Sequence, residues 1–232
     1  MIVGLPPIFI KINLKERKMK KNDLKLIGAF IDSKNPNAAL NYALVKPSGI
    51  YATDTKKAIR FCFYGLDNVG LIHKKLLKGF ESILGKDEVV SYKDGYFYVQ
   101  DAKLPIDTSY HFVENEKRYG VHPTDYSDID RVINIELPNH FVLEDISDIQ
   151  FELAQKNCFI DDVHLNPIIS FTDCSYFDIF YKPQEKIIED GREKIDNGIV
   201  KIVGSRHDSD GVMDVCFIAV IMGRTFESKA SE

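Results

Sequence analysis

Two acidic stretches of the sequence carry residue types that can hold a divalent cation. Asp125, Asp128 and Asp130 lie close together, and residues 207–211 read His-Asp-Ser-Asp-Gly. Carboxylate oxygens are the ligands that calcium and magnesium prefer, but neither stretch has the spacing of a known calcium loop. Solvated loop acids are therefore the favoured interpretation. A metal-dependent nuclease or phosphodiesterase that uses these aspartates is the enzyme alternative.

The sequence contains none of the common catalytic or nucleotide-binding motifs. GxxxxGK[ST], GxGxxG, HExxH and GxSxG are all missing, and the six histidines are isolated from one another. The four cysteines form no CxxC pair, and free thiols of this kind behave as small core hydrophobes in a reducing compartment. We therefore predict no enzymatic activity, no cofactor and no metal site. We expect a cytoplasmic protein or, if it is viral, one of the host-cell interior.

A Thr-Asp pair opens a short polar turn between two strand-like stretches. Thr53-Asp54-Thr55 is followed by two lysines, and a second pair, Thr172-Asp173, lies 119 residues later in a similar apolar setting. Thr and Asp side chains stabilise turns through hydrogen bonds to the backbone, which accounts for Asp54 without a binding function. Two similar turns in one chain indicate two similar domains.

Length and composition indicate a folded protein of one large domain or two smaller ones. The 232 residues are 44% hydrophobic and 28% charged. The longest strongly apolar run, residues 215–222, is far below the ~20 residues that span a bilayer, so no membrane partner is expected. The apolar start of the chain lacks a basic region and a cleavage site, so we expect a strand or an ordered arm there.

The charge is distributed unevenly along the chain. The formal net charge is -5, but residues 1–86 hold 16 Lys and Arg against 6 Asp and Glu, whereas residues 87–232 hold 14 against 29. Such asymmetry bears on partners rather than on the fold, and a basic region on an otherwise acidic protein is typical of a polyanion-binding face. Scattered solvated charges are the alternative.

The hydrophobic pattern of the first half predicts one helix and three strands, used twice. Leu24, Ile27 and Ile31 recur at helical spacing, as do the apolar residues of 73–84. The expected elements are a helix at 22–31 with strands at 39–45, 49–53 and 57–65, then a helix at 73–84 with strands at 87–92, 95–100 and 103–113.

The second half shows the same pattern in a degraded form, after a polar loop at 114–131. The expected elements are a strand at 132–137, a helix at 143–156, strands at 163–171 and 176–182, a weak helix at 186–196, and strands at 198–204 and 211–223. We place the domain boundary just before Val132, which gives domains 1–131 and 132–232.

Several short stretches, in this order and spacing, resemble bacterial DNA sliding clamps, the β subunit of the replicative polymerase. They are YATDTKKA, HKKLLKGFESIL, KDGYFYV, HPTDYSDIDRVI and FIAVIMGRTF. The resemblance covers residues 22–226 and two of the family's three domains. It implies an α+β fold of two tandem clamp domains, with antiparallel sheets outside and helices lining one face. Because the family's ring has six domains, it also implies a homotrimer.

The resemblance further implies a processivity factor that encircles duplex DNA irrespective of its sequence and tethers a polymerase. The lysines that would face the DNA are Lys20, Lys21, Lys25, Lys74, Lys75 and Lys78. Peptides of polymerases and clamp loaders would bind a pocket formed by Thr53, Thr55, Lys57, Ala58, Pro138, Phe141, Val220 and Met222.

The sequence also departs from the family pattern. The expected helix at 143–156 carries Glu144, Asp145, Asp148 and Glu152 against Lys156 alone, and Gly223 stands where the family has Pro-Met. A clamp-fold scaffold that binds partner peptides without encircling DNA is therefore a further alternative.

Overall fold

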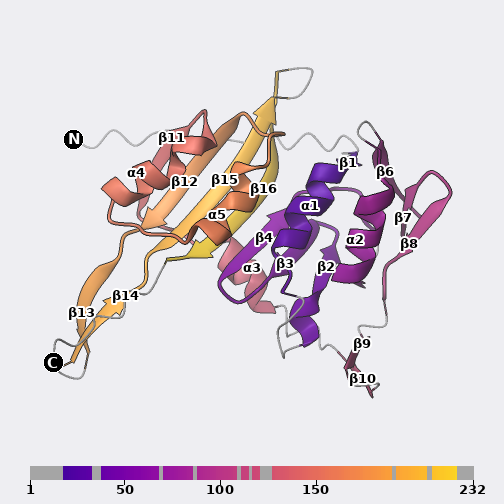
Figure 1. Cartoon of the computed structure of the whole chain (residues 1–232), viewed down its shortest axis with the longest axis horizontal. Coiled ribbons are helices and arrows are strands. Elements are labelled where there is room, and N and C mark those ends of the chain that lie inside the picture. Colours follow the sequence, from indigo (N-terminus) through magenta and orange to yellow (C-terminus); the bar gives the residue numbers. More distant parts are fainter. Residues whose placement is uncertain are drawn as a thin grey trace.

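The N-terminal half is built from two copies of a unit of one strand, one helix and three strands (Figure 1). The computed structural model describes residues 18–32, 38–67, 70–85, 88–108, 111–114, 117–120, 127–189, 192–207 and 211–223. The first unit contains β1 (Met19–Lys20), α1 (Lys21–Ala29), a 3₁₀ turn η1 (Ala38–Asn41), β2 (Tyr42–Lys46), β3 (Gly49–Thr53) and β4 (Lys57–Phe61). The second contains β5 (Gly70–His73), α2 (Lys74–Ile83), β6 (Val89–Lys93), β7 (Tyr96–Val99) and β8 (Ala102–Pro105). The expected order of a helix and three strands is confirmed in both units.

Each unit places its leading strand in the sheet of the other. β1 pairs antiparallel with β6, which gives the strand order β1-β6-β7-β8. β5 pairs antiparallel with β2, so the sheet of the first unit reads β5-β2-β3-β4. Neither sheet is complete without a strand from the other unit, so the exchange joins both units into one domain.

The described residues of the C-terminal half form one such four-stranded unit. Between the halves lie the hairpin β9 (His111–Glu114) and β10 (Lys117–Gly120), and α3 (Ser127–Ile133). There follow β11 (Asn139–Leu143), a 3₁₀ turn η3 (Ile146–Asp148), α4 (Ile149–Gln155), α5 (Asp162–Ile169), β12 (Tyr176–Lys182), the hairpin β13 (Glu185–Glu189) and β14 (Arg192–Asp196), β15 (Ile199–His207) and β16 (Met213–Met222). The unit has the strand order β11-β12-β15-β16, in which β11 pairs with β12 as β1 pairs with β6. Residues 156–161 join α4 directly to α5. Unlike α1 and α2, α4 is therefore not followed by three strands before the next helix.

The two halves share one continuous sheet. β16 pairs antiparallel with β4, from Phe217 opposite Phe61 to Ile221 opposite Lys57. This junction produces an eight-stranded sheet in the order β11-β12-β15-β16-β4-β3-β2-β5. Backbone hydrogen bonds therefore link the halves at the centre of the molecule.

Helices α1, α2, α4 and α5 lie on one face of the sheets, and α3 lies on the opposite face. α4, α5, α1 and α2 follow one another across the molecule (Figure 1), and their apolar side chains form one core with the sheets. Ile129 and Ile133 of α3 pack on a second cluster that includes Leu44, Tyr51 and Val220. Residues that alternate along β2, β3 and β4 thus enter two different cores, as expected for strands covered on both faces. The expected α+β class, with antiparallel sheets and helices along one face, is confirmed.

Four expectations for the second half are wrong. Residues 163–171 form helix α5 rather than a strand, and residues 186–196 form the hairpin β13–β14 rather than a helix. The expected strand at 132–137 contains the end of α3, and the expected helix at 143–156 is shortened to η3 and α4.

Tertiary packing explains the helix at 163–171, and a turn dipeptide explains the hairpin at 186–196. Pro167 and the β-branched residues of 163–171 favour an extended chain, but burial of Leu165 and Ile168 against the sheet stabilises the helix. Asp190-Gly191 is a dipeptide typical of two-residue hairpin loops. The expected N-terminal arm at residues 1–17 and the chain end beyond Gly223 lie outside the described residues.

Candidate nucleic-acid interface

α1 and α2 pack side by side and enclose a groove with lysines along it. Its volume is about 300 Å³, and its lining includes Lys25, Lys74 and Lys78, with one carboxylate, Glu81. Leu24 and Leu77, both buried, form its floor. Two helices distant in sequence thus place three ammonium groups around one depression, which raises the local positive potential.

Two of the six lysines named from the sequence join the helix ends. Lys21 Nζ donates a hydrogen bond of 3.1 Å to the carbonyl oxygen of Leu84, just after α2, and Lys74 Nζ donates one to the carbonyl oxygen of Ile31, just after α1. A cation at a helix C-terminus offsets the negative end of the helix dipole. Burial lowers the pKa of Lys74, and the charge of nearby Lys78 lowers it further. Lys21 and Lys74 therefore hold the two helices antiparallel.

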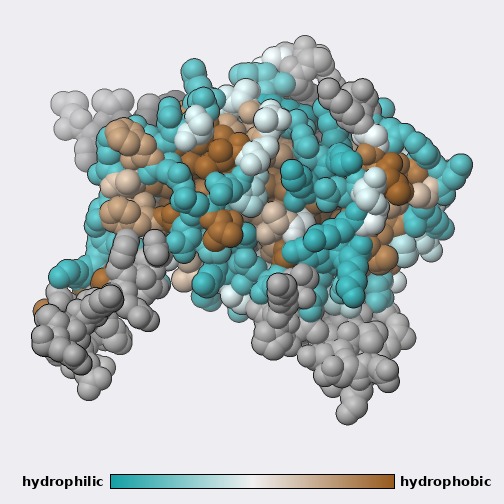
Figure 2. Space-filling view, viewed as in Figure 1, coloured by the Kyte–Doolittle hydropathy of each residue, from teal (hydrophilic) through white to brown (hydrophobic). Residues whose placement is uncertain are grey.

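The other four lysines are exposed and form what we call the lysine face, comprising Lys20, Lys25, Lys75 and Lys78. Within the described part of the chain, none of their ammonium groups forms an ion pair or a hydrogen bond, although the backbone N–H of Lys20 donates to Asp23 Oδ2 at 2.7 Å. Figure 2 shows a mainly hydrophilic surface over α1 and α2. These side chains are thus free to neutralise an anionic partner.

Small residues keep this surface shallow. A Cβ added to Gly28 of α1 or Gly79 of α2 would meet no atom within 4 Å, so internal packing does not require either glycine. Glycine inside a helix costs about 1 kcal/mol relative to alanine. With Ala29 beside them, these positions let a partner approach the helix backbones closely.

The helix face of the C-terminal half carries exposed carboxylates and apolar side chains instead of lysines. We call four of its exposed residues, Asp148, Phe151, Asp162 and Val163, the acidic face. The Phe151 side chain is 66% exposed and that of Val163 is 65% exposed. Asp162 accepts a hydrogen bond from Gln150, and Lys156 is engaged by Glu152 at 2.8 Å. The excess of acidic residues seen in the sequence at 143–156 is therefore also present on the folded surface, and α4 and α5 present no positively charged face.

The Thr-Asp turn is fully explained by its own hydrogen bonds. Asp54 Oδ1 accepts from the backbone N–H groups of Lys56 at 3.0 Å and Lys57 at 2.9 Å. Thr53 Oγ1 donates to the carbonyl oxygen of Lys57 at 2.9 Å and accepts from the N–H of Thr55 at 3.3 Å. Such local bonds are typical of Asx and ST turns.

Lys57, the last residue of that turn, is buried on the helix side of the sheet. Its Nζ lies 3.7 Å from Asp54 Oδ2 and 5.1 Å from the ring centre of Phe30. Burial lowers the pKa of Lys57, although the carboxylate of Asp54 acts in the opposite direction. Lys57 therefore points away from the face that carries Ala58.

The remaining residues named for a peptide pocket fall into two groups. Ala58 and Val220 lie opposite each other on β4 and β16, beneath α3, and Met222 is 45% exposed at the end of β16. Thr53 pairs with Ala58, and the N–H of Met222 bonds to the carbonyl of Lys56, so these belong to one neighbourhood.

Pro138 and Phe141 lie elsewhere. Phe141 is in β11, at the far edge of the eight-stranded sheet, where Lys156 of α4 lies 4.6 Å from its ring centre on the helix side. Pro138 is exposed just before that strand. The fold therefore does not bring these two residues to the β4–β16 junction.

No metal centre is formed by the residues that the structure describes. Within them, no three His, Cys, Asp or Glu side chains gather in a way that could hold an ion. Asp130 instead pairs with Lys46 and fastens α3 to β2, while Asp125, Asp208 and Asp210 lie outside the described residues. Cys62, Cys158 and Cys216 are buried free thiols, and burial raises the pKa of Cys158 to about 11. No helix in the described ranges has the length and apolar character needed to span a bilayer.

A cleft of about 290 Å³ lies between α1 and α5. Sequence reasoning missed this cleft and the cover that α3 provides over the opposite sheet face. The cleft depends on α5, which was interpreted as a strand. Ile129 and Ile133, spaced four residues apart on α3, were an available signal for an amphipathic helix turn.

Comparisons with known proteins give similarity in structure only. No protein-family model matches the chain, and no curated protein matches it. The Helicobacter pylori beta clamp in complex with carprofen is 9% identical, with a TM-score of 0.46, over 97% of this chain and 70% of that chain. The same clamp bound to a DNA ligase peptide is 12% identical, with a TM-score of 0.37, over 93% and 67%. DNA polymerase III subunit beta from Borrelia burgdorferi is 12% identical, with a TM-score of 0.44, over 91% and 63%. All three of these solved structures to which the chain is similar are bacterial beta clamps, and all three TM-scores are below 0.5.

Proposed function

We propose that this protein is a non-catalytic DNA clamp factor whose lysine face rests on the phosphate backbone of duplex DNA. The supporting observation is the set of four exposed ammonium groups, one on α1, two on α2 and one on Lys20 at the end of β1, beside helix glycines that packing does not require. Lysine–phosphate contacts release counterions and do not depend on base sequence. Such contacts hold a protein on DNA and still allow it to slide.

We further propose that three copies encircle the DNA and tether a polymerase. The edge strands β8 and β11 lie at opposite ends of the molecule (Figure 1), so they are available for head-to-tail pairing between copies. A head-to-tail interface gives a ring when its rotation closes. Peptides of polymerases and loaders would bind beside Thr53 and the exposed Met222, at the β4–β16 junction.

The DNA contact is tested by the salt dependence of binding. Each phosphate contact contributes about 0.9 to the slope of log affinity against log salt. We expect Lys75→Gln/Lys78→Gln to reduce that slope by about two and to weaken binding to a 30-base-pair duplex of any sequence. The matched control is Lys93→Gln/Lys103→Gln, which removes two exposed lysines from β6 and β8 of the four-stranded sheet. Equal slopes for the two double variants would overturn the proposed contact.

Encirclement is tested by topology. A ring assembled on nicked circular DNA is retained at high salt and is lost when the circle is cut, with three chains bound per ring. The second candidate, a scaffold that does not encircle DNA, is favoured by the acidic face and by the C-terminal half, whose described residues supply one four-stranded unit where the N-terminal half supplies two. Equal retention on circular and linear DNA would decide for that scaffold.

A further inference from the structure

The two faces of opposite character lie on the same side of the molecule. In Figure 1, α4 and α5 continue the row formed by α1 and α2, and contacts between α5 and α1 join the two pairs. The lysine face carries cations with no ion pair in the described part of the chain, and the acidic face carries carboxylates and two exposed apolar side chains. One side of the molecule therefore carries both a positively charged surface and a negatively charged surface that could bind it in a second copy.

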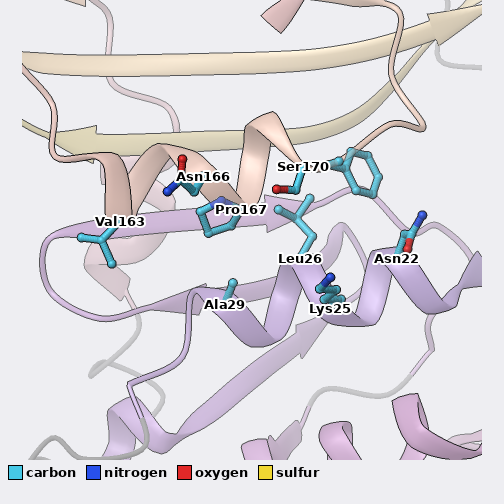
Figure 3. Close-up of a pocket in the computed structure, with 9 residues that line it drawn as sticks. Asn22, Lys25, Leu26, Ala29, Val163, Asn166, Pro167 and Ser170 are labelled. Atoms are coloured by element: carbon cyan, nitrogen blue, oxygen red, sulfur yellow. The ribbon is translucent and has the colours of Figure 1, made fainter. Parts of the chain in front are cut away.

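A cleft marks the boundary between these halves. It has a volume of about 290 Å³ and lies between α1 and α5, where Leu26 and Ala29 face Val163 and Pro167 (Figure 3). Lys25 stands on the α1 side of this cleft. The cleft runs between the second and third helices of a row of four, so it divides the helix face into two parts of similar extent.

A two-fold axis along this cleft would bring the two faces of two copies together. If the axis lies in the plane of contact between two copies, it places α5 of each copy on α1 of the other and α4 on α2. An isologous contact of this kind forms every favourable pair twice. The alternative axis, across the helices, would place lysines on lysines and is disfavoured by like-charge repulsion.

The exposed residues of α4 and the lining of the α1–α2 groove are also complementary in chemical character. Phe151 projects from α4 with 66% of its side chain exposed, next to the carboxylate of Asp148 one turn earlier. The α1–α2 groove is lined by apolar and small residues, among them Leu24, Leu77 and Gly28. Its charged lining residues are Lys25, Lys74 and Lys78, with the single carboxylate Glu81. An aromatic ring with an adjacent carboxylate is complementary to an apolar groove edged by ammonium groups.

We infer that, in the absence of DNA, two copies of this protein pair through their helix faces, with Phe151 of each copy in the α1–α2 groove of the other. The acidic face then covers the lysine face. DNA and the second copy compete for the same ammonium groups, so each weakens the binding of the other. This competition rests on the proposed DNA contact, whereas the self-association does not.

The mass of the DNA-free protein tests the inference. By multi-angle light scattering at 50 mM salt we expect twice 26.5 kDa. We expect Phe151→Lys to raise the dimer dissociation constant by about thirtyfold or more, because it removes an aromatic anchor and places a cation against lysines. Phe151 is exposed, so the variant keeps its core. The matched control is Ile188→Lys, an 81% exposed residue of the β13–β14 hairpin, which should dimerise as the wild type does.

Two results would overturn the inference, and both are separable from a failure of the proposed DNA contact. A wild-type monomer or trimer at 50 mM salt and 100 μM protein excludes the dimer. So does a Phe151→Lys variant that dimerises as well as Ile188→Lys. Duplex binding by a Phe151→Ser monomer, which adds no cation to the helix side, reports on the lysine face alone. If that monomer fails to bind DNA while the wild type dimerises, only the proposed function falls.

Discussion

At the scale of single residues, the Thr-Asp turn shows how a local motif can be sufficient for structure. Asp54 and Thr53 satisfy four backbone groups between β3 and β4, so the turn needs no ligand to explain its composition. It does so with a residue in an unfavourable conformation. Thr55 has a φ of 77°, a region that β-branched residues rarely adopt.

Replacing Thr55 by glycine is therefore expected to stabilise the protein. The strained conformation costs about 1 kcal/mol or more for a β-branched residue, whereas glycine adopts positive φ freely. Urea denaturation should show an increase of about 1 kcal/mol in the free energy of unfolding for Thr55→Gly. Thr55→Val keeps the branched side chain and is the control. A lower stability for the glycine variant would show that the Thr55 side chain makes a contribution larger than the strain.

His164 gives the protein a dependence on acidic pH. Burial lowers the pKa of this α5 histidine, and the charge of Lys57 lowers it further. Its Nδ1 atom is buried without a hydrogen-bond partner in the described structure. Because the pKa in the folded state lies below that in the unfolded state, protonation favours unfolding. The stability is present above the unfolded value of about 6.5 and is lost as the pH falls through the folded pKa.

We expect His164→Gln to flatten the decrease of stability between pH 7.5 and pH 5. Urea midpoints across that range measure the effect. His207→Gln, which alters an exposed imidazole, controls for the loss of one histidine. An unchanged pH profile in the His164 variant would exclude its burial as the cause.

At the level of secondary-structure elements, α3 covers the sheet face opposite α1, α2, α4 and α5. Ile133 is fully buried and Ile129 is 6% exposed, and both contact residues of strands from the two halves. The ion pair between Lys46 and Asp130 fixes the helix to β2. A helix of seven residues is not stable alone, so its order depends on these contacts.

Truncating Ile133 should therefore destabilise the whole fold. Ile133→Ala removes buried apolar volume and is expected to lower the free energy of unfolding by about 2–4 kcal/mol. Val132→Ala alters a side chain of the same helix that is 40% exposed, and should cost less than about 1 kcal/mol. Thermal or urea denaturation measures both variants. Similar costs at the two positions would mean that α3 does not pack as a cover.

At the scale of the whole molecule, the eight-stranded sheet makes one unit from two sequence domains. The ladder between β4 and β16 is extended by a backbone bond of 2.9 Å from Cys62 N to the carbonyl of Cys216. Opening either half exposes the core side chains of these central strands. Cooperative unfolding of both halves follows from this arrangement.

Hydrogen exchange should show this cooperativity directly. We expect the amides of β4 and β16 to exchange with the same free energy, equal to that of global unfolding. The β13–β14 hairpin, a separate two-stranded sheet, should exchange at a much lower free energy. Different free energies for β4 and β16 would show that the halves open independently.

The sequence by itself determined the α+β class, the twofold use of a helix and three strands in the N-terminal half, and the lysines of α1 and α2. These depend on local periodicity and turn residues such as Asp94-Gly95, which act within a few residues. The exchange of β1 and β5, the helical state of α5, the separation of Phe141 from Val220, and the hydrogen bonds of Lys21 and Lys74 that join the helix ends could be seen only in the folded molecule. Each of these depends on burial or pairing between segments distant along the chain. The free energy of such contacts outweighs local preference, and no short stretch of sequence records it.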